Sequence, residues 1–573
     1  MANRAAVHLQ QLEAMKRSHG PGCARICERV LERLEGAKFE DAQSLIQFHD
    51  ALLFLRAFPQ SARVAKLADR LLATVEAQVQ RVIDLPAEAE LFDDEAVSGI
   101  AGTTVTNSWT FELARSLADR HPHKISAEWS VEERYWQMAM VLPNCLPLLE
   151  DDSFVEADTP FLKWIEAAAE TGNSDLNWLL SSLAKLPVSP RLRTSLYDAL
   201  GVGMQWDLRG SPASRTLARR PVSRFFVHDT PLQQRKQVSL RNEMASSPLQ
   251  LRKLSRYEGQ TIIDMARDAL AVRYRELHGT THGSPECVFE ADAGRGVRFY
   301  LWSLPDQWQL PLRGYLAGIT IKNGVPINYI EAIGLFEWLE VGFNTFYAFR
   351  EGETAWIYSK VLHLLHQLTG VTCISVYPYQ IGQDNEEAIE SGAFWFYRKL
   401  GFRPGRPDLL ALTELEETKM KRNPAHRTAA ATLRKLAEGH MFFEFGGTQN
   451  GRWDSFSTRK LGLAVQRKMA ADFNGDAERM RQVTTSRLSQ ILAVNLDTWN
   501  TRERWAFSNF AVVLALVPDV ARWTNDDKRA LVTVIRAKAG PNETKYLRRS
   551  QKLNVLREAL LRAGSDAAND EAD

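Results

Sequence analysis

The chain has no apolar run near the ~18 residues that a membrane-spanning helix requires. Its five cysteines are scattered and odd in number, which suits a reducing cytoplasm and argues against a disulfide framework. The net charge is only +1, so no overall field draws the protein to nucleic acid or to a membrane. We therefore expect a cytoplasmic protein that does not associate with membranes.

Several catalytic and metal-binding signatures are also missing. The chain contains no Walker loop, no dinucleotide fingerprint and no HExxH order. His278 and His282 are four residues apart, but Gly279 and Gly283 favour a loop over a metal-bearing helix. No metal site is expected.

Helical and strand periodicity divide the chain of 573 residues into several parts. A helical pattern interrupted by prolines is followed by a basic stretch, a strand-rich segment and a second helical pattern. The expected parts are a helical domain (1–205), a basic connector (206–256), an α/β domain (257–410), a helical C-terminal domain (411–563) and a disordered tail (564–573).

The basic connector has two interpretations. Between Arg209 and Arg256 eleven Lys or Arg face only two acids, Asp229 and Glu243. Such a run can bind phosphates, which makes nucleic acid a candidate partner through 209–256. The neutral overall charge and the small number of aromatic residues favour a connector that pairs with acidic surface elsewhere.

The α/β segment begins with β-branched and aromatic runs, then alternates helix and strand. Asn323-Gly324 predicts a type I′ hairpin turn. The amphipathic pattern of 353–368 predicts a helix, and 372–377 a short buried strand. The earlier strands are predicted at 287–291, 297–302, 315–322, 326–336 and 342–349.

The stretch 385–404, NEEAIESGAFWFYRKLGFRP, predicts an aromatic-rich helix that Gly401 ends and a strand that Phe402 begins. From Ala393 onward this helix-to-strand unit resembles the last such unit of the GNAT acyltransferases, and the strand order agrees. The resemblance covers about a quarter of the chain. It implies an α+β fold: a mixed, mostly antiparallel GNAT-like sheet domain between helical regions.

The resemblance also implies an activity. Acetyl-CoA or another acyl-CoA would donate its acyl group to an amine of an acceptor, which can be a protein. Tyr397 stands where the family often protonates the departing thiolate, whose pKa near ~8.5 suits a phenol donor. Because Tyr397 follows three other aromatic residues, it can equally be a core residue. Glu331 and Glu337, with Glu340, are the candidates for the base that takes the amine proton.

The loop before the predicted helix is where the family binds pyrophosphate. The residues implied to hold the cofactor are Arg350, Gly352, Thr354, Ala355 and Asn385. The pattern departs from the family at Glu351 and Glu353, because each carboxylate at ~4 Å from a phosphate costs on the order of a few kcal/mol. The same two acids would suit an ordinary helix start.

A second departure lies in the final helix. The family commonly has an asparagine three residues before the alanine that Ala393 matches, and this chain has Glu390 there. Two hypotheses follow. The chain is a GNAT-like acyltransferase between helical domains, or a non-catalytic GNAT-fold protein whose helical regions bind a protein partner.

Overall fold

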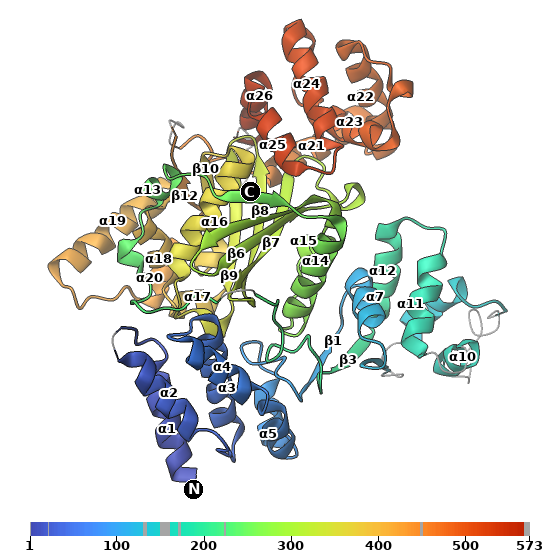
Figure 1. Ribbon diagram of the computed structural model, residues 1–573. Helices are drawn as coiled ribbons and strands as arrows, with labels where there is room; N and C mark the ends of the chain where they lie inside the picture. The colour runs from blue at the N-terminus through green and yellow to red at the C-terminus, as the bar shows by residue number, and fades with distance from the viewer. Residues whose placement is uncertain are drawn as a thin grey trace.

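The computed structural model describes residues 2–20, 22–129, 135–148, 161–169, 174–222, 225–446 and 451–565. A nine-stranded sheet lies at the centre, with N-terminal helices at one end of the molecule and C-terminal helices at the other (Figure 1). The expected α+β class, a mostly antiparallel sheet between helical regions, is confirmed.

The central sheet runs in the order β11-β12-β10-β9-β8-β7-β6-β5-β4, and only β9 and β10 pair in parallel. Val, Ile and aromatic side chains dominate its middle strands, as suits a sheet buried on both faces. The strands are β4 (Gln250–Lys253), β5 (Val288–Gly294), β6 (Val297–Ser303), β7 (Gly314–Lys322), β8 (Val325–Leu335), β9 (Trp338–Thr345), β10 (Cys373–Val376), β11 (Arg403–Pro404) and β12 (Met441–Glu444).

The hairpin turns explain the strand boundaries. Asn323 and Gly324 have φ of 48° and 86°, as a type I′ turn between β7 and β8 requires. Phe336, a bulky residue, also has a positive φ of 54° in the next turn. Because no glycine marks that turn, the sequence pattern did not reveal it. β9 starts and ends four residues earlier than the strand expected at 342–349. Residues Tyr347–Phe349 form a 3-10 turn (η7) instead.

The parallel pair separates along its length. Register pairs Trp338, Leu339 and Glu340 of β9 with the first three residues of β10. Beyond Glu340, β9 continues to Thr345 bonded only to β8, while β10 ends at Val376. The two strands therefore open a gap at their carboxyl ends.

Helices on one face border this gap. α16 (Thr354–Thr369) connects β9 to β10, close to the predicted 353–368. The expected aromatic helix is split by Gly392, whose φ is 67°, into α17 (Glu386–Glu390) and α18 (Ala393–Leu400). Gly401 ends α18 with φ of 107°, as predicted from its position.

The N-terminal helices share a core with the sheet. Phe58 and Phe346 belong to one continuous cluster of buried apolar side chains, and Asn323 Nδ2 donates to Ala57 O (2.9 Å). This hydrogen bond thus joins the β7–β8 hairpin turn to the C-terminal end of α3 (Ala42–Ala57). These helices are α1 (Ala2–Met15), α2 (Cys23–Arg33), α3 (Ala42–Ala57), α4 (Ala62–Leu72), α5 (Val75–Val82) and α6 (Pro86–Ala89).

A second core lies between residues 105 and 208. Three short strands that the sequence did not indicate form a sheet of their own, with Trp206 fully buried against Trp109. Strands of four or five residues give little periodic signal. The elements are β1 (Thr104–Asn107), α7 (Phe111–Arg120), β2 (Ile125–Glu128), α8 (Tyr135–Val141), α10 (Phe161–Ala168), α11 (Asp175–Lys185), α12 (Pro190–Leu200) and β3 (Gly203–Asp207).

The basic connector 206–256 contributes structure too: α13 (Leu240–Met244) and the edge strand β4, followed by α14 (Arg256–Ala271) and α15 (His278–Thr281). Five of its cations pair with carboxylates, one of them within the connector itself. The pairs are Arg209–Asp207, Arg215–Asp50, Arg219–Asp69, Arg252–Glu258 and Arg256–Glu286.

After residue 406 the elements of the described residues are helices and one strand, β12, which enters the central sheet between β10 and β11. Tyr546 and Leu547 fasten the last helices to the sheet, because Tyr546 donates to Leu312 O and Leu547 packs on Gly314. The helices are α19 (Pro407–Arg422), α20 (Ala430–Leu436), α21 (Thr458–Phe473), α22 (Ala477–Leu492), α23 (Thr501–Leu514), α24 (Asn525–Lys538), α25 (Glu543–Ser550) and α26 (Asn554–Ser565).

The expected tail lies almost wholly outside the described residues: 564–565 belong to α26, and 566–573 are not described. In the described parts of the chain, no helix has both the length and the apolar character to cross a bilayer.

Candidate functional site

The gap between β9 and β10 is bridged by one side chain. Gln380 lies in the 3-10 turn that follows β10, and its Nε2 donates to Val341 O (3.2 Å). Its Oε1 accepts from the Tyr397 hydroxyl (3.3 Å), so Tyr397 reaches the gap from α18. Tyr397 is buried, and burial raises the pKa of its hydroxyl above the ordinary value.

Glu331 approaches the same point along the sheet. It lies on β8 directly opposite Gly342 of β9, and its carboxylate accepts a hydrogen bond from the Tyr315 hydroxyl. A Cβ at Gly342 would lie 3.4 Å from Gln380 Nε2 and 3.7 Å from Glu331 Cβ. Gly342 thus separates Glu331 from Gln380, and Gln380 in turn bonds Tyr397. Burial raises the pKa of Glu331.

Glu337 and Glu340 are held elsewhere. Glu337 lies before β9 begins, where its carboxylate accepts from Trp453 Nε1 (3.2 Å) and pairs with Arg557 (3.3 Å). Glu340 pairs with His440 (3.1 Å) on the sheet. Glu337 therefore connects the sheet to the C-terminal helices, and the structure does not bring it to Gly342 and Gln380, which lie between Glu331 and Tyr397.

The loop before α16 is occupied by the protein's own groups. A Cβ built on Gly352 would lie 2.5 Å from a ring atom of Phe58, so the end of α3 packs directly on this glycine. The Arg350 guanidinium stacks on Tyr347 (3.8 Å) and forms an ion pair with Glu387.

The other residues implied to hold a cofactor also have internal contacts. Thr354 Oγ1 donates to Arg350 O (3.2 Å), and Ala355 is buried. Asn385 Oδ1 accepts from Ala388 N (3.1 Å) and Nδ2 donates to Tyr379 O (3.0 Å), which makes Asn385 the N-cap of α17. None of these side chains is free to turn toward a ligand without losing a contact.

The two acids of the loop are bound by cations from other segments. Glu353 is fully buried, forms an ion pair with Arg295 from the β5–β6 turn, and accepts from Gln233 N (3.0 Å). Glu351 pairs with Lys16 (3.0 Å) and Arg17 (2.8 Å) beyond α1. Glu353 thus joins this loop to the β5–β6 turn and to residue 233, whereas Glu351 joins it to the N-terminal region.

A buried lysine lies beside Glu353 and was not identified from sequence. Lys322 Nζ donates to His228 Nε2 (2.8 Å) and to Arg295 O, and lies over the ring of Phe58 (5.0 Å). Burial lowers the pKa of Lys322 to about 7, although Glu353 opposes this shift. The sequence shows only that Lys322 directly precedes the Asn323-Gly324 turn. The turn predicts that Lys322 lies at the end of a strand, but not that its side chain is buried.

His278, the first residue of α15, and His282, the residue that follows this helix, are packed against an aromatic ring. His282 stacks on Trp308 (3.7 Å), and His278 Nε2 lies 3.1 Å from Trp308 O. No set of three His, Cys, Asp or Glu side chains in the described residues is arranged to hold a metal ion.

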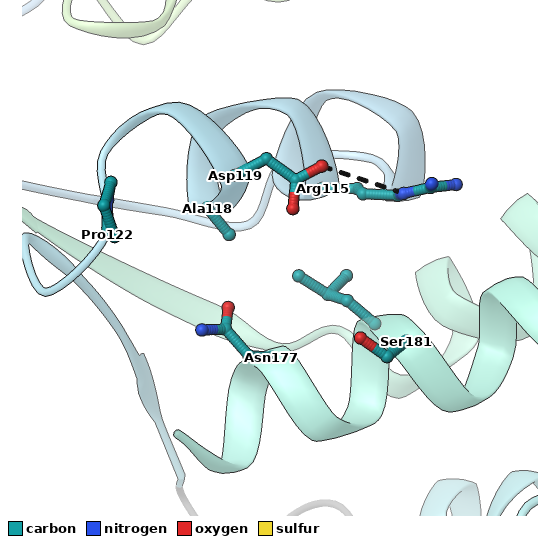
Figure 2. Close-up of a pocket in the computed structure, with 7 residues that line it drawn as sticks. Arg115, Ala118, Asp119, Pro122, Asn177 and Ser181 are labelled. Carbon is teal, nitrogen blue, oxygen red and sulfur yellow. Dashed lines mark ion pairs between the residues drawn. The ribbon is translucent and has the colours of Figure 1, made fainter. Parts of the chain in front are cut away.

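Two cavities lie outside this region. A cavity of about 250 Å³ separates α7 from α11, where Asn177 and Ser181 face Ala118 and Asp119 (Figure 2). Asp119 pairs there with Arg115 (3.9 Å). A larger cavity of about 840 Å³ is bordered by α17, α18, α19 and α20, with Trp395 among its lining residues.

No protein-family model, no curated protein and no solved structure matches this chain. Any functional conclusion therefore rests on the residues and contacts described above.

Proposed function

We propose that this chain is a non-catalytic protein with a GNAT-like sheet domain, and that its helical regions bind a protein partner. One observation carries this proposal: the loop before α16 is filled by Phe58, which packs on Gly352, and by the buried pair of Glu353 with Arg295. In the family that the chain resembles, this loop receives the pyrophosphate of acyl-CoA.

Electrostatics and space both oppose an anion there. The N-terminal end of α16 already has a carboxylate, Glu353, buried next to it. A pyrophosphate beside Glu353 would add negative charge at a site with little solvent, where a like-charge contact at ~4 Å costs on the order of a few kcal/mol or more. The ring of Phe58 leaves no space above Gly352 for the ligand to approach the backbone. Binding would require the α3 end to withdraw.

Calorimetry with acetyl-CoA and with a longer acyl-CoA tests the proposal. The intact protein should give no binding heat with either. Phe58→Ala should remove the ring above Gly352, and because Glu353 remains, it should still not bind. Phe54→Ala is the matched control, because Phe54 stacks on Phe58 (4.9 Å) without being among the atoms nearest Gly352. Micromolar binding by the intact protein would overturn the proposal.

A second candidate is favoured by the series of contacts from Glu331 past Gly342 to Gln380 and from Gln380 to Tyr397. In a GNAT-like acyltransferase the amine of the acceptor, which can be a protein, would attack the thioester carbonyl of acetyl-CoA or another acyl-CoA. Glu331 would accept the amine proton, and Tyr397 would donate a proton to the departing thiolate. Arg350, Gly352, Thr354, Ala355 and Asn385 would hold the cofactor.

This candidate requires the Gln380 bridge to open, since Gln380 now occupies the place where the thioester would enter. Acyl-CoA hydrolysis or transfer, measured by release of free thiol, tests it in the intact protein and in Gln380→Ala. Activity that appears only in Gln380→Ala would favour a blocked enzyme, and activity in neither would favour the binding protein.

A further inference from the structure

The C-terminal helices carry a strong positive charge although the whole chain is nearly neutral. Residues 451–565 contain 21 Lys or Arg and only 11 Asp or Glu. These helices lie at one end of the molecule (Figure 1). The C-terminal helices therefore form a strongly basic end, and such an excess on one part of a protein favours a polyanionic partner.

Helix α22 presents the clearest part of this basic end. Met480, Thr484 and Leu488 are buried on its inner side. Its outer side carries a stripe of exposed residues at helical spacing: Arg479, Gln482, Val483, Ser486, Arg487 and Gln490. Glu478 is exposed beside Arg479, and its carboxylate accepts from Gln482 Nε2 (2.9 Å).

The two arginines of this stripe are available to a ligand. Within the described residues, neither Arg479 nor Arg487 makes a side-chain hydrogen bond or an ion pair. This contrasts with the basic connector, where Arg209, Arg215 and Arg219 are bound to carboxylates. Unpaired arginines on a rigid helix are ready to bind phosphates without first breaking an internal pair.

The neighbouring helix adds an aromatic group. Trp505 of α23 is 57% exposed, and the Arg481 guanidinium lies 4.8 Å from its ring. Arg481 is positioned by hydrogen bonds to Ser508 Oγ (2.8 Å) and Asn509 Oδ1 (3.0 Å). Arg504 is exposed beside Trp505. Helices α22 and α23 are neighbours (Figure 1), and Arg481 lies on the side of α22 that faces α23, not in the outer stripe.

We propose that the outer face of α22 binds double-stranded DNA. A helix of about 10–12 Å diameter fits the roughly 12 Å wide major groove. Arginine, glutamine and serine are the side chains that bind phosphates and base edges there. Double-stranded RNA is disfavoured, because its major groove is too narrow and deep for side chains to read.

Fluorescence anisotropy of the full chain with a labelled duplex of about 20 base pairs tests the proposal. Affinity should fall steeply between about 50 and 200 mM salt. Arg479→Glu with Arg487→Glu should weaken binding at least about 10-fold and reduce the slope against log salt by about 2, one for each lost phosphate contact.

The matched control is Lys421→Glu with Arg422→Glu at the exposed end of α19, which changes the total charge equally. Because these residues are on another helix, this variant should bind within about 2-fold of the original. Unchanged melting curves must show that both variants fold. The proposal is overturned if the duplex does not bind, if both double variants weaken binding equally, or if double-stranded RNA or poly-glutamate binds as tightly as the DNA.

Discussion

Glu353→Gln should loosen the contact between the loop before α16 and the β5–β6 turn. The substitution keeps the size of the side chain but removes its charge, which leaves Arg295 without its carboxylate and Lys322 without the nearby negative charge. Breaking a buried pair costs about 3–5 kcal/mol. Because the Arg295 side chain is 22% exposed, water compensates part of this loss, and we expect about 3 kcal/mol.

Hydrogen–deuterium exchange is the suitable assay, because a chain with several cores need not unfold in a single step. A loss of about 3 kcal/mol corresponds to a roughly 10²-fold increase in local opening. Amides around Arg295 and in the first turn of α16 should therefore exchange about 10²-fold faster. Amides in β3 and α24, which belong to other cores, should not change.

Glu351→Gln is the matched control, two residues away in the same loop. Its carboxylate is 40% exposed and bonds Lys16 and Arg17 at the surface, where such pairs contribute at most about 1 kcal/mol. In Glu351→Gln the amides around Arg295 and in the first turn of α16 should exchange less than about 5-fold faster than in the original protein. Equal acceleration in the two variants, or none in Glu353→Gln, would refute the argument that the buried pair holds this loop closed.

Three further predictions concern other sites. Between pH 7 and its ordinary pKa of 10.5, Lys322 binds fewer protons in the folded than in the unfolded chain, so melting temperatures should rise with pH across this window. Lys322→Met should flatten that rise, and an unchanged pH profile would contradict the burial argument. Tyr397→Phe should lower acyl transfer by roughly 10²-fold if the chain is an acyltransferase, and otherwise reduce stability by about 1 kcal/mol through loss of the bond to Gln380. Melting curves and thiol release distinguish these outcomes. Trp206→Ala should destabilise the 105–208 core by about 3–5 kcal/mol. Amide exchange should accelerate in β1 and β3 but not in β8. Equal acceleration in all three strands would show that the two cores unfold together.

Local sequence determined the elements of the central domain. The I′ turn at Asn323-Gly324 requires two positive φ angles, which these residue types readily adopt, and so it sets the register of β7 and β8. Gly401 ends α18 for the same reason. The apolar stripe of α16 gave its bounds within one residue. Each of these features depends on residues close together in the chain.

Only the tertiary structure decided where distant segments meet. β12 enters the sheet between β10 and β11 because its four residues find unpaired strand edges there, and so short a run carries no periodic signal of its own. Likewise β1 and β3 exist through pairing with each other across about a hundred residues. In the turn at Phe336, a side chain without any preference for positive φ is held there by its neighbours, so the start of β9 was missed.

The candidate site shows the same division. The resemblance to the GNAT family made Tyr397, Glu331 and the loop from Arg350 to Ala355 candidates. The sequence did not show that Gln380 would bridge the gap between β9 and β10, or that Phe58 would cover Gly352. Both contacts join segments that are apart in the chain, and the second depends on how the N-terminal helices pack on the sheet. Charge at the loop was visible in sequence as Glu351 and Glu353, but only the fold supplied the cations that neutralise them.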